Sequence, residues 1–138
     1  MSTLRYQVMQ AVATALSSAS ASKFEQLDDA LASSAVPALI YGWRSDEVED
    51  MGMLDKHMLT IAVQAYTRGA SADSGADTLI GQAYGLLTAD RSLGGKVKRM
   101  NIGPAEREST QEGGKGVLIT QFLTLEYLAE RGSLTVAA

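Results

Sequence analysis

Residues Leu54–Arg68, with the sequence LDKHMLTIAVQAYTR, alternate between two kinds of position more regularly than any other part of the chain. One face of such a strand holds His57, Leu59, Ile61, Val63 and Ala65, and the other holds Lys56, Met58, Thr60, Ala62, Gln64, Tyr66 and Arg68. A period of two with β-branched and aromatic residues is typical of a strand with one buried face. This stretch therefore predicts the middle strand of an antiparallel sheet.

The length of the chain predicts a single domain over residues 1–138, which is long enough to bury a hydrophobic core. The chain has no cysteine, so the fold is expected to hold without disulfides or thiolate metal sites. No window has the run of about 18 apolar residues that a membrane helix needs, so we expect a soluble, unexported protein without a membrane partner. A formal net charge of −4 disfavours a general nucleic-acid binder.

Two segments have the apolar spacing of amphipathic helices. The first covers residues 3–18, where Ser2 or Thr3 is available as an N-cap. The second covers residues 74–90, with a start resembling a capping box at Ser74 and Asp77 and a stop at Gly94-Gly95. Each helix has one apolar stripe to bury against the sheet.

Further strands are predicted over residues 23–26, 36–43, 97–102, 104–110 and 117–129. The intervening residues predict a helical turn at 28–32, a charged connection at 45–50 and a glycine-rich turn at 113–116. The expected fold class is α+β: an antiparallel or mixed β-sheet with two α-helices packed on one face and long β-hairpin extensions. Two strands exceed the usual length of about 5–6 residues. Strands that extend beyond the hydrophobic core of their own chain favour self-association.

No motif in the sequence predicts catalysis, a cofactor or a metal site. His57 is the sole histidine and is interpreted as a residue at the margin of the sheet. The acidic run at 46–50 is interpreted as a solvated hairpin loop instead of a cation site, and the glycines at 113–116 lack the spacing of a phosphate loop. One basic cluster would suit DNA, an acidic partner or an ordinary surface; it contains Arg91, Lys96, Lys98 and Arg99.

Taken in order, these pieces resemble a known family. The most telling are the strand entry at residues 36–41 (VPALIY) and the helix exit at residues 87–97 (LTADRSLGGKV), followed by a long last strand. Over about residues 4–10 and 36–128, the chain resembles the tail terminator proteins of long-tailed bacteriophages, the lambda-type minor tail protein that caps the tail tube.

The resemblance implies a homohexameric ring that binds the last ring of tail tube protein, stops its polymerisation and presents its other side to the head–tail connector protein. DNA would pass through the lumen without specific binding. The protein would lie in the virion, at the head-proximal end of the tail, after assembly in the host cytoplasm. No cofactor or catalytic residue is implied. The subunit interface is assigned to Tyr66, Leu118, Phe122 and Leu128, and the axial partner contacts to Arg44, Asp46, Glu47, Glu49 and Asp50.

Three alternatives remain open at this point. The chain departs from the family pattern between residues 18 and 35, which leaves room for a head–tail connector or tail-completion protein of related fold. A small α+β enzyme or ligand-binding module would use His57 and nearby carboxylates, and it requires an enclosed pocket around that histidine. The third alternative is an oligomeric cytoplasmic protein without any link to a phage.

Overall fold

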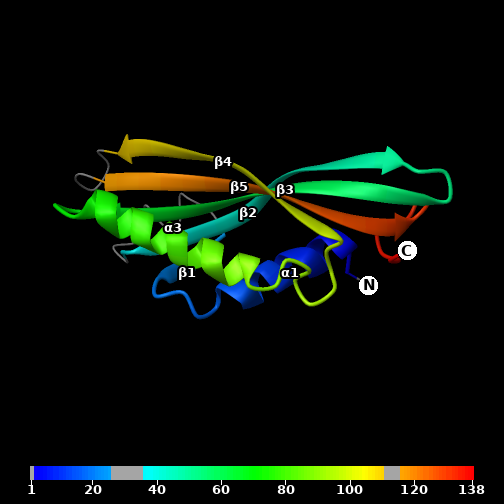
Figure 1. Cartoon of the computed structure of the whole chain (residues 1–138), viewed down its shortest axis with the longest axis horizontal. Helices are drawn as coiled ribbons and strands as arrows, with labels where there is room; N and C mark the ends of the chain where they lie inside the picture. Colours follow the sequence, from blue (N-terminus) through cyan, green and yellow to red (C-terminus); the bar gives the residue numbers. More distant parts are fainter. Residues whose placement is uncertain (1, 26–35, 111–115) are drawn as a thin grey trace.

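The computed structural model describes residues 2–25, 36–110 and 116–138. These residues form one mixed five-stranded β-sheet and two α-helices (Figure 1). In chain order, the elements are α1 (Leu4–Leu16), β1 (Ser22–Phe24), β2 (Ala38–Asp50), β3 (Leu54–Arg68), α3 (Ala72–Thr88), β4 (Arg99–Thr110) and β5 (Gly116–Glu130). The predicted α+β fold, with its two helices and its long strands, is confirmed.

The strand predicted from the alternating stretch lies at the centre of the sheet. The strand order is β1-β2-β3-β5-β4; β1 runs parallel to β2, and every other neighbouring pair is antiparallel. All 15 residues of β3 pair with β5, from Leu54 opposite Glu130 to Arg68 opposite Gly116. The other edge of β3 pairs with β2, so β3 is hydrogen bonded to a strand on both sides and forms the centre of the sheet.

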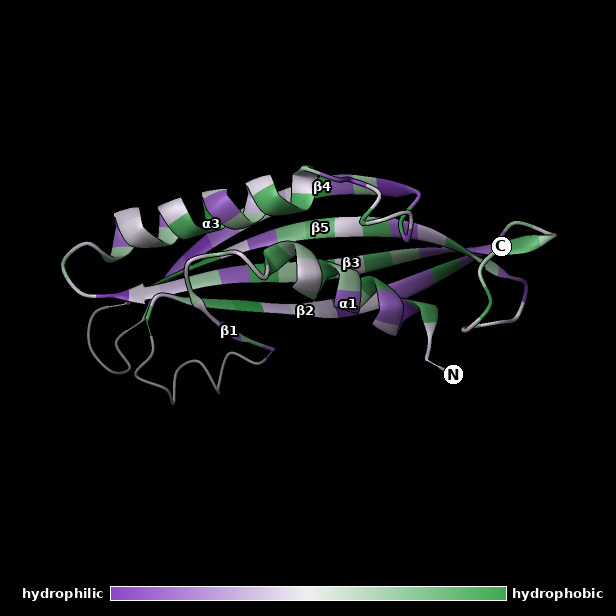
Figure 2. Cartoon of the chain, turned by 90° about the horizontal axis from the view of Figure 1, so that it is seen from below, coloured by the Kyte–Doolittle hydropathy of each residue, from purple (hydrophilic) through white to green (hydrophobic). Residues whose placement is uncertain are grey.

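Both helices pack on the same face of the sheet, which Figure 2 views from the helix side. The apolar stripe of α1 and that of α3 meet the apolar face of β3 in one core. Fully burying an aliphatic side chain contributes about 1.5–3 kcal/mol relative to leaving it in water, so this core is the main source of stability. Its central members are Val8, Val12, Leu16, Leu59, Ile61, Val63, Leu79, Ala83, Leu87, Leu123 and Leu125.

The opposite face of the sheet carries a second, smaller apolar cluster. Ala38 and Ile40 of β2, Tyr66 of β3 and Leu118 of β5 are buried there, and Phe24 of β1 packs against them. Further along the same face, charged side chains such as Lys56 and Glu126 lie among half-buried apolar ones such as Phe122 and Leu128. The two ends of this face therefore differ in chemistry.

The charged connection predicted at residues 45–50 is wrong, because these residues form the second half of β2. They pair with β3 from Ser45 opposite Thr60 to Asp50 opposite Asp55, after a bulge at Arg44. Acidic residues have low strand propensity, so the local sequence concealed a strand that the register with β3 stabilises. The real turn is at residues 51–53, where Gly52 has a φ of 92° and its N–H donates to Asp50 Oδ1.

Three smaller boundaries also differ from the prediction. The strands expected at 97–102 and 104–110 are one strand, β4, with a bulge between Ile102 and Ala105 that accommodates Pro104. The helix α3 begins at Ala72 after Ser71, so the proposed capping box at Ser74 is wrong. The predicted helical turn at 28–32 and most of the predicted turn at 113–116 lie outside the described residues.

The exit from α3 is organised by Asp90, four residues before the glycine pair that was expected to stop the helix. The helix ends at Thr88, and the Asp90 carboxylate then accepts hydrogen bonds from the N–H groups of Ser92 and Gly94 and from the Ser92 hydroxyl. These hydrogen bonds, chiefly the one from the Ser92 hydroxyl, lower the pKa of Asp90. Gly94 and Gly95 then turn the chain toward β4 with φ values of 71° and 85°.

The β2–β3 hairpin and the end of β5 extend past both helices, at the right-hand end of Figure 1. We call residues 47–56 of this hairpin the arm. Its apolar side chains are largely in solvent: Val48 and Met51 are about half exposed, and Met53 is 94% exposed. The predicted hairpin extension is thus present. At its tip, Arg131 donates a hydrogen bond to the Gly52 carbonyl, and the apolar side chains of the tip remain in solvent.

Candidate functional site

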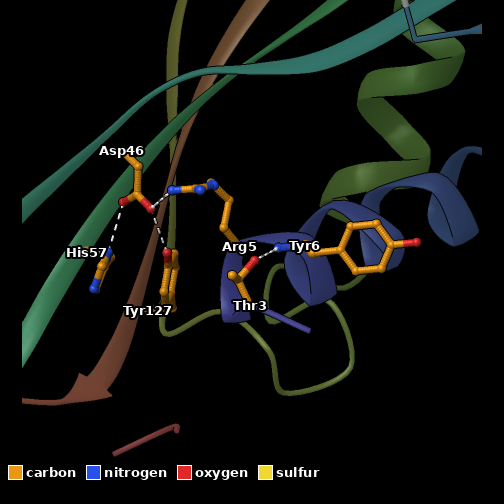
Figure 3. Close-up of polar contacts among 6 residues, drawn as sticks. All are labelled: Thr3, Arg5, Tyr6, Asp46, His57 and Tyr127. Carbon is orange, nitrogen blue, oxygen red and sulfur yellow. Dashed lines mark hydrogen bonds and ion pairs between the residues drawn. The ribbon is translucent and has the colours of Figure 1, made fainter. Parts of the chain in front are cut away.

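A buried polar cluster lies where the arm leaves the core. Asp46 of β2 is at its centre, and its two carboxylate oxygens face His57 of β3, Tyr127 of β5 and Arg5 of α1 (Figure 3). The distances are 3.0 Å from Asp46 Oδ1 to His57 Nδ1, 2.7 Å from Oδ2 to the Tyr127 hydroxyl and 3.1 Å from Oδ2 to the Arg5 guanidinium. Four elements are therefore tied together by one carboxylate.

The donors of this cluster are assigned for an ionised Asp46 carboxylate. An ionised carboxylate accepts hydrogen bonds only, so His57 Nδ1, the Tyr127 hydroxyl and Arg5 are all donors to Asp46. The rings of His57 and Tyr127 also stack, with centroids 4.6 Å apart. Burial of the Tyr127 ring, followed by its hydrogen bond to Asp46, raises the pKa of this hydroxyl, so it remains a donor at neutral pH.

The geometry around His57 is unlike that of a catalytic histidine. The residue is 1% exposed, and its Nε2 has no hydrogen-bond partner among the described residues. In a catalytic triad, Nε2 faces a nucleophile at a site that substrate reaches. Three cavities open onto the described residues at other places, and none of these three is lined by His57, Asp46 or Tyr127. The interpretation of His57 as a residue of the sheet margin is also wrong, because it is buried in the central strand.

A groove of about 630 Å³ lies beside the cluster, between α1 and β2. Arg5 forms one wall and places its guanidinium 4.4 Å from the centre of the Trp43 ring, at cation–π distance. The same arginine thus bridges the buried Asp46 and the exposed Trp43. The aromatic and charged lining of the groove includes Tyr6, Glu25 and Tyr41.

On the opposite face of the sheet, charged side chains form a row across four strands. Lys56 of β3 lies 4.0 Å from Glu49 of β2 and 2.8 Å from Glu126 of β5, and Arg99 of β4 lies 3.6 Å from the second oxygen of Glu126. The order from one edge of the sheet to the other is acid, base, acid, base. We call these four residues the charge row. Its two inner members are the more buried and its two end members the more exposed.

The inner pair of the charge row is coupled. The hydrogen bond from Lys56, the largest cause, lowers the pKa of Glu126, and the same bond raises the pKa of Lys56. A lowered carboxyl pKa adds stability above the unfolded value of about 4.3 that is lost as pH falls through the folded value. A raised lysine pKa adds stability below about 10.4 that is lost as pH rises through its folded value.

A pH prediction follows from this pair. The loss of unfolding free energy caused by Glu126→Gln is expected to be constant between about pH 5 and pH 9 and to shrink on acidification below about pH 4, because the wild-type carboxyl is then protonated as well. Urea unfolding at several pH values measures it. The exposed Glu106, replaced by glutamine, is the matched control, and a difference between wild type and E126Q that is the same at pH 3 and pH 7 would contradict the coupling.

The residues assigned to axial partner contacts do not form one surface. Arg44, Glu47, Glu49 and Asp50 are exposed on the second half of β2, whereas the Asp46 side chain is 5% exposed and faces the buried cluster. Asp50 also pairs with Arg131 at 3.2 Å, which fixes the C-terminal segment to the arm. Sequence reasoning missed Arg5 and Tyr127, since neither lies in a motif. Asp46 and His57 lie near each other across the antiparallel β2–β3 hairpin. The register of that hairpin, had it been known, would have indicated their proximity.

The residues assigned to a subunit interface share one face of the sheet, as the alternation predicted. Tyr66 and Leu118 are buried within the chain itself, in the smaller apolar cluster. Phe122 and Leu128 are half-buried. A contact between subunits on this face would therefore use Phe122 and Leu128, and the assignment stays a prediction.

Among the described residues, neither helix combines the length and the apolar character that crossing a bilayer requires. Within the same residues, no group of three or more histidine or acidic side chains is placed to hold a metal ion. Neither the protein-family models nor the curated proteins with which the sequence was compared match this chain.

Proposed function

We propose that this chain is a structural protein of a long-tailed bacteriophage, a tail terminator whose six copies close into a ring on the end of the tail tube. The ring would stop polymerisation of the tube and offer its other side to the head–tail connector. The observation that carries the proposal is the sheet itself: its strands outrun the helices, and both of its outer strands have edges without a described partner. Such a subunit is built to be completed by neighbours.

The polar cluster supports an assembly role over catalysis. Its carboxylate accepts from three donors, its histidine is buried, and its tyrosine is held as a donor. A cluster with these properties stabilises the attachment of the arm to the core. The resemblance of the VPALIY strand entry and of the helix exit to those of tail terminators supplies the specific role, and these segments form the start of β2 and the exit from α3.

Electron microscopy with mass determination on concentrated protein tests the proposal. Six chains of 14.6 kDa would give a particle of about 88 kDa with six-fold symmetry and an open centre. Added to polymerising tail tube protein, the protein is expected to shorten the tubes and to label one end of each. A chain that stays monomeric alone and leaves tube length unchanged would contradict the proposal.

The head–tail connector is the second candidate, because the same free edges and arm would serve a ring at the neighbouring position. It differs in its partner. Pull-down of tube protein without portal protein supports the terminator, and the reverse supports the connector. A ligand-binding role would use the groove beside Arg5 and Trp43, where a ligand would quench the fluorescence of the sole tryptophan.

A further inference from the structure

The sheet has two open edges that differ in charge: the outer edge of β2 beyond Ile40, and the outer edge of β4. β1 covers β2 only at Ala38, Leu39 and Ile40, so no described residue pairs with the outer edge of β2 beyond them. β4 pairs with β5 on one side and has no described strand on the other. Unpaired strand edges expose backbone N–H and C=O groups that a further strand would satisfy.

The directions of the strands allow one copy of the sheet to continue into the next. β2 and β5 run one way and β3 and β4 the other, since each neighbouring pair among them is antiparallel. A β4 edge placed beside the β2 edge of another copy would therefore form an antiparallel pair. The acidic end of β2 would then lie beside the basic start of β4.

The charge row indicates the same partner. It begins with an acid at the β2 edge, Glu49, whose side chain is 54% exposed, and it ends with a base at the β4 edge, Arg99, whose side chain is 72% exposed. Placing β4 beside β2 of the next copy would extend the alternation from Arg99 to the neighbour's Glu49 without a break. Cross-strand pairs of opposite charge stabilise a sheet, and like charges directly opposite destabilise it.

The same charges disfavour symmetric pairing of like edges. Glu47, Glu49 and Asp50 would repel across a β2–β2 contact, and Lys96, Lys98 and Arg99 would repel across a β4–β4 contact. The remaining contact joins two different edges, head to tail, which is the type of contact that closes into rings. The bulge at Arg44 and Pro104 limit the regular part of each edge to residues 45–50 of β2 and 99–102 of β4.

We propose that copies of this chain associate by antiparallel pairing of residues 45–50 of β2 with residues 99–102 of β4 in the next copy, with the charge row continuing across the contact. This inference rests on the proposed ring and names the surface that closes it. It moves the main contact from the face that holds Phe122 to the two edges. The basic cluster thereby has an acidic partner, which is a second copy of the chain.

Two charge-reversed variants test the pairing. The acid-edge variant carries Glu47→Lys and Glu49→Lys, and the base-edge variant carries Lys98→Glu and Arg99→Glu. Each alone has two edges of one sign and is expected to need at least about tenfold more protein for assembly. An equimolar mixture is expected to assemble like wild type, because the two variants alternate and six is an even number. Glu106→Lys with Glu108→Lys, exposed on β4 beyond Pro104, is the control that should assemble unaided.

Cross-linking supplies a measurement that does not depend on altered charge. The chain has no cysteine, so Glu47→Cys with Asn101→Cys introduces the only two thiols. Within one chain, these positions are three strand spacings apart, about 14 Å, so a bismaleimide shorter than that joins them only between copies. A ladder of products up to the hexamer is expected. Cross-linked dimers from the single Glu47→Cys variant would overturn the pairing.

The outcomes separate this inference from the proposed function. Hexameric rings that persist in both charge-reversed variants overturn the edge pairing but remain compatible with a tail terminator. In that case Phe122→Asp is expected to prevent ring formation. Edge-paired assemblies that do not close at six copies support the pairing and overturn the ring. A chain that is monomeric at every concentration and does not cross-link overturns both.

Discussion

Replacing Asp46 with alanine is expected to lower the free energy of unfolding by about 3–5 kcal/mol, the range for removal of one partner from a buried charged pair. The substitution leaves the Tyr127 hydroxyl and His57 Nδ1 without their acceptor in a buried site and frees Arg5 from the sheet. Urea unfolding followed by the fluorescence of the sole tryptophan measures the loss. Trp43 lies three residues before Asp46 in β2 and also contacts Arg5, so its fluorescence reports on the same region.

Two variants separate the carboxylate from other effects of substitution in β2. Glu47→Ala removes an exposed carboxylate at the next position and is expected to change stability by no more than about 0.5 kcal/mol. Asp46→Asn retains one acceptor oxygen but sets an amide N–H₂ against donors, so an intermediate loss is expected. Equal effects of Asp46→Ala and Glu47→Ala would show that the cluster does not tie the arm to the core.

The parts of the fold that the sequence predicted are those in which local pattern and tertiary packing agree. The alternation of Leu54–Arg68 indicated a central strand because one face of β3 is buried under two helices. The periodic residues Val8 and Val12 indicated α1 for the same reason, and both are in the core. In each case the element has one apolar face that packs on the core, so the spacing of its apolar residues is enough to identify the element as a strand or a helix.

The second half of β2 escaped prediction because four of its six residues are acidic and have low strand propensity. Residues 45–50 are held in the sheet by their register with β3 and by the contacts of one residue, Asp46, with three other elements. Those contacts join positions separated by 11, 41 and 81 residues. A cluster assembled over such separations leaves no local motif, which is why Arg5 and Tyr127 were not identified.

The charge row was likewise hidden by its spacing. Glu49 and Lys56 are seven residues apart around a hairpin, and Glu126 and Arg99 belong to two strands that are distant in the chain. In sequence, the first belonged to an acidic run and the last to a basic cluster, each of which was interpreted as a solvated surface. The register of four strands converts them into one alternating row whose two ends are complementary.

Replacing His57 with alanine is expected to lower the free energy of unfolding by about 2–4 kcal/mol and to leave any activity of the folded chain unchanged. The variant loses the ring stacked on Tyr127, opens a cavity in the central strand and removes one donor to Asp46. Because both residues act in one cluster, the effects of His57→Ala and Asp46→Ala should not add; a double-mutant cycle is expected to give a coupling of about 1–3 kcal/mol.

His57→Phe is the matched variant for the histidine, because phenylalanine preserves the stack on Tyr127 and removes the Nε2 that has no described partner, while it loses the hydrogen bond to Asp46. It should recover part of the stability lost in His57→Ala, and its assembly should equal that of wild type. The catalytic alternative expects the opposite pattern: stability and assembly unchanged in His57→Ala, with an enzymatic activity lost in both variants. If stability is lost in His57→Ala and partly restored in His57→Phe, then the aromatic side chain at position 57 helps to hold the arm on the core. The burial of His57 favours this role.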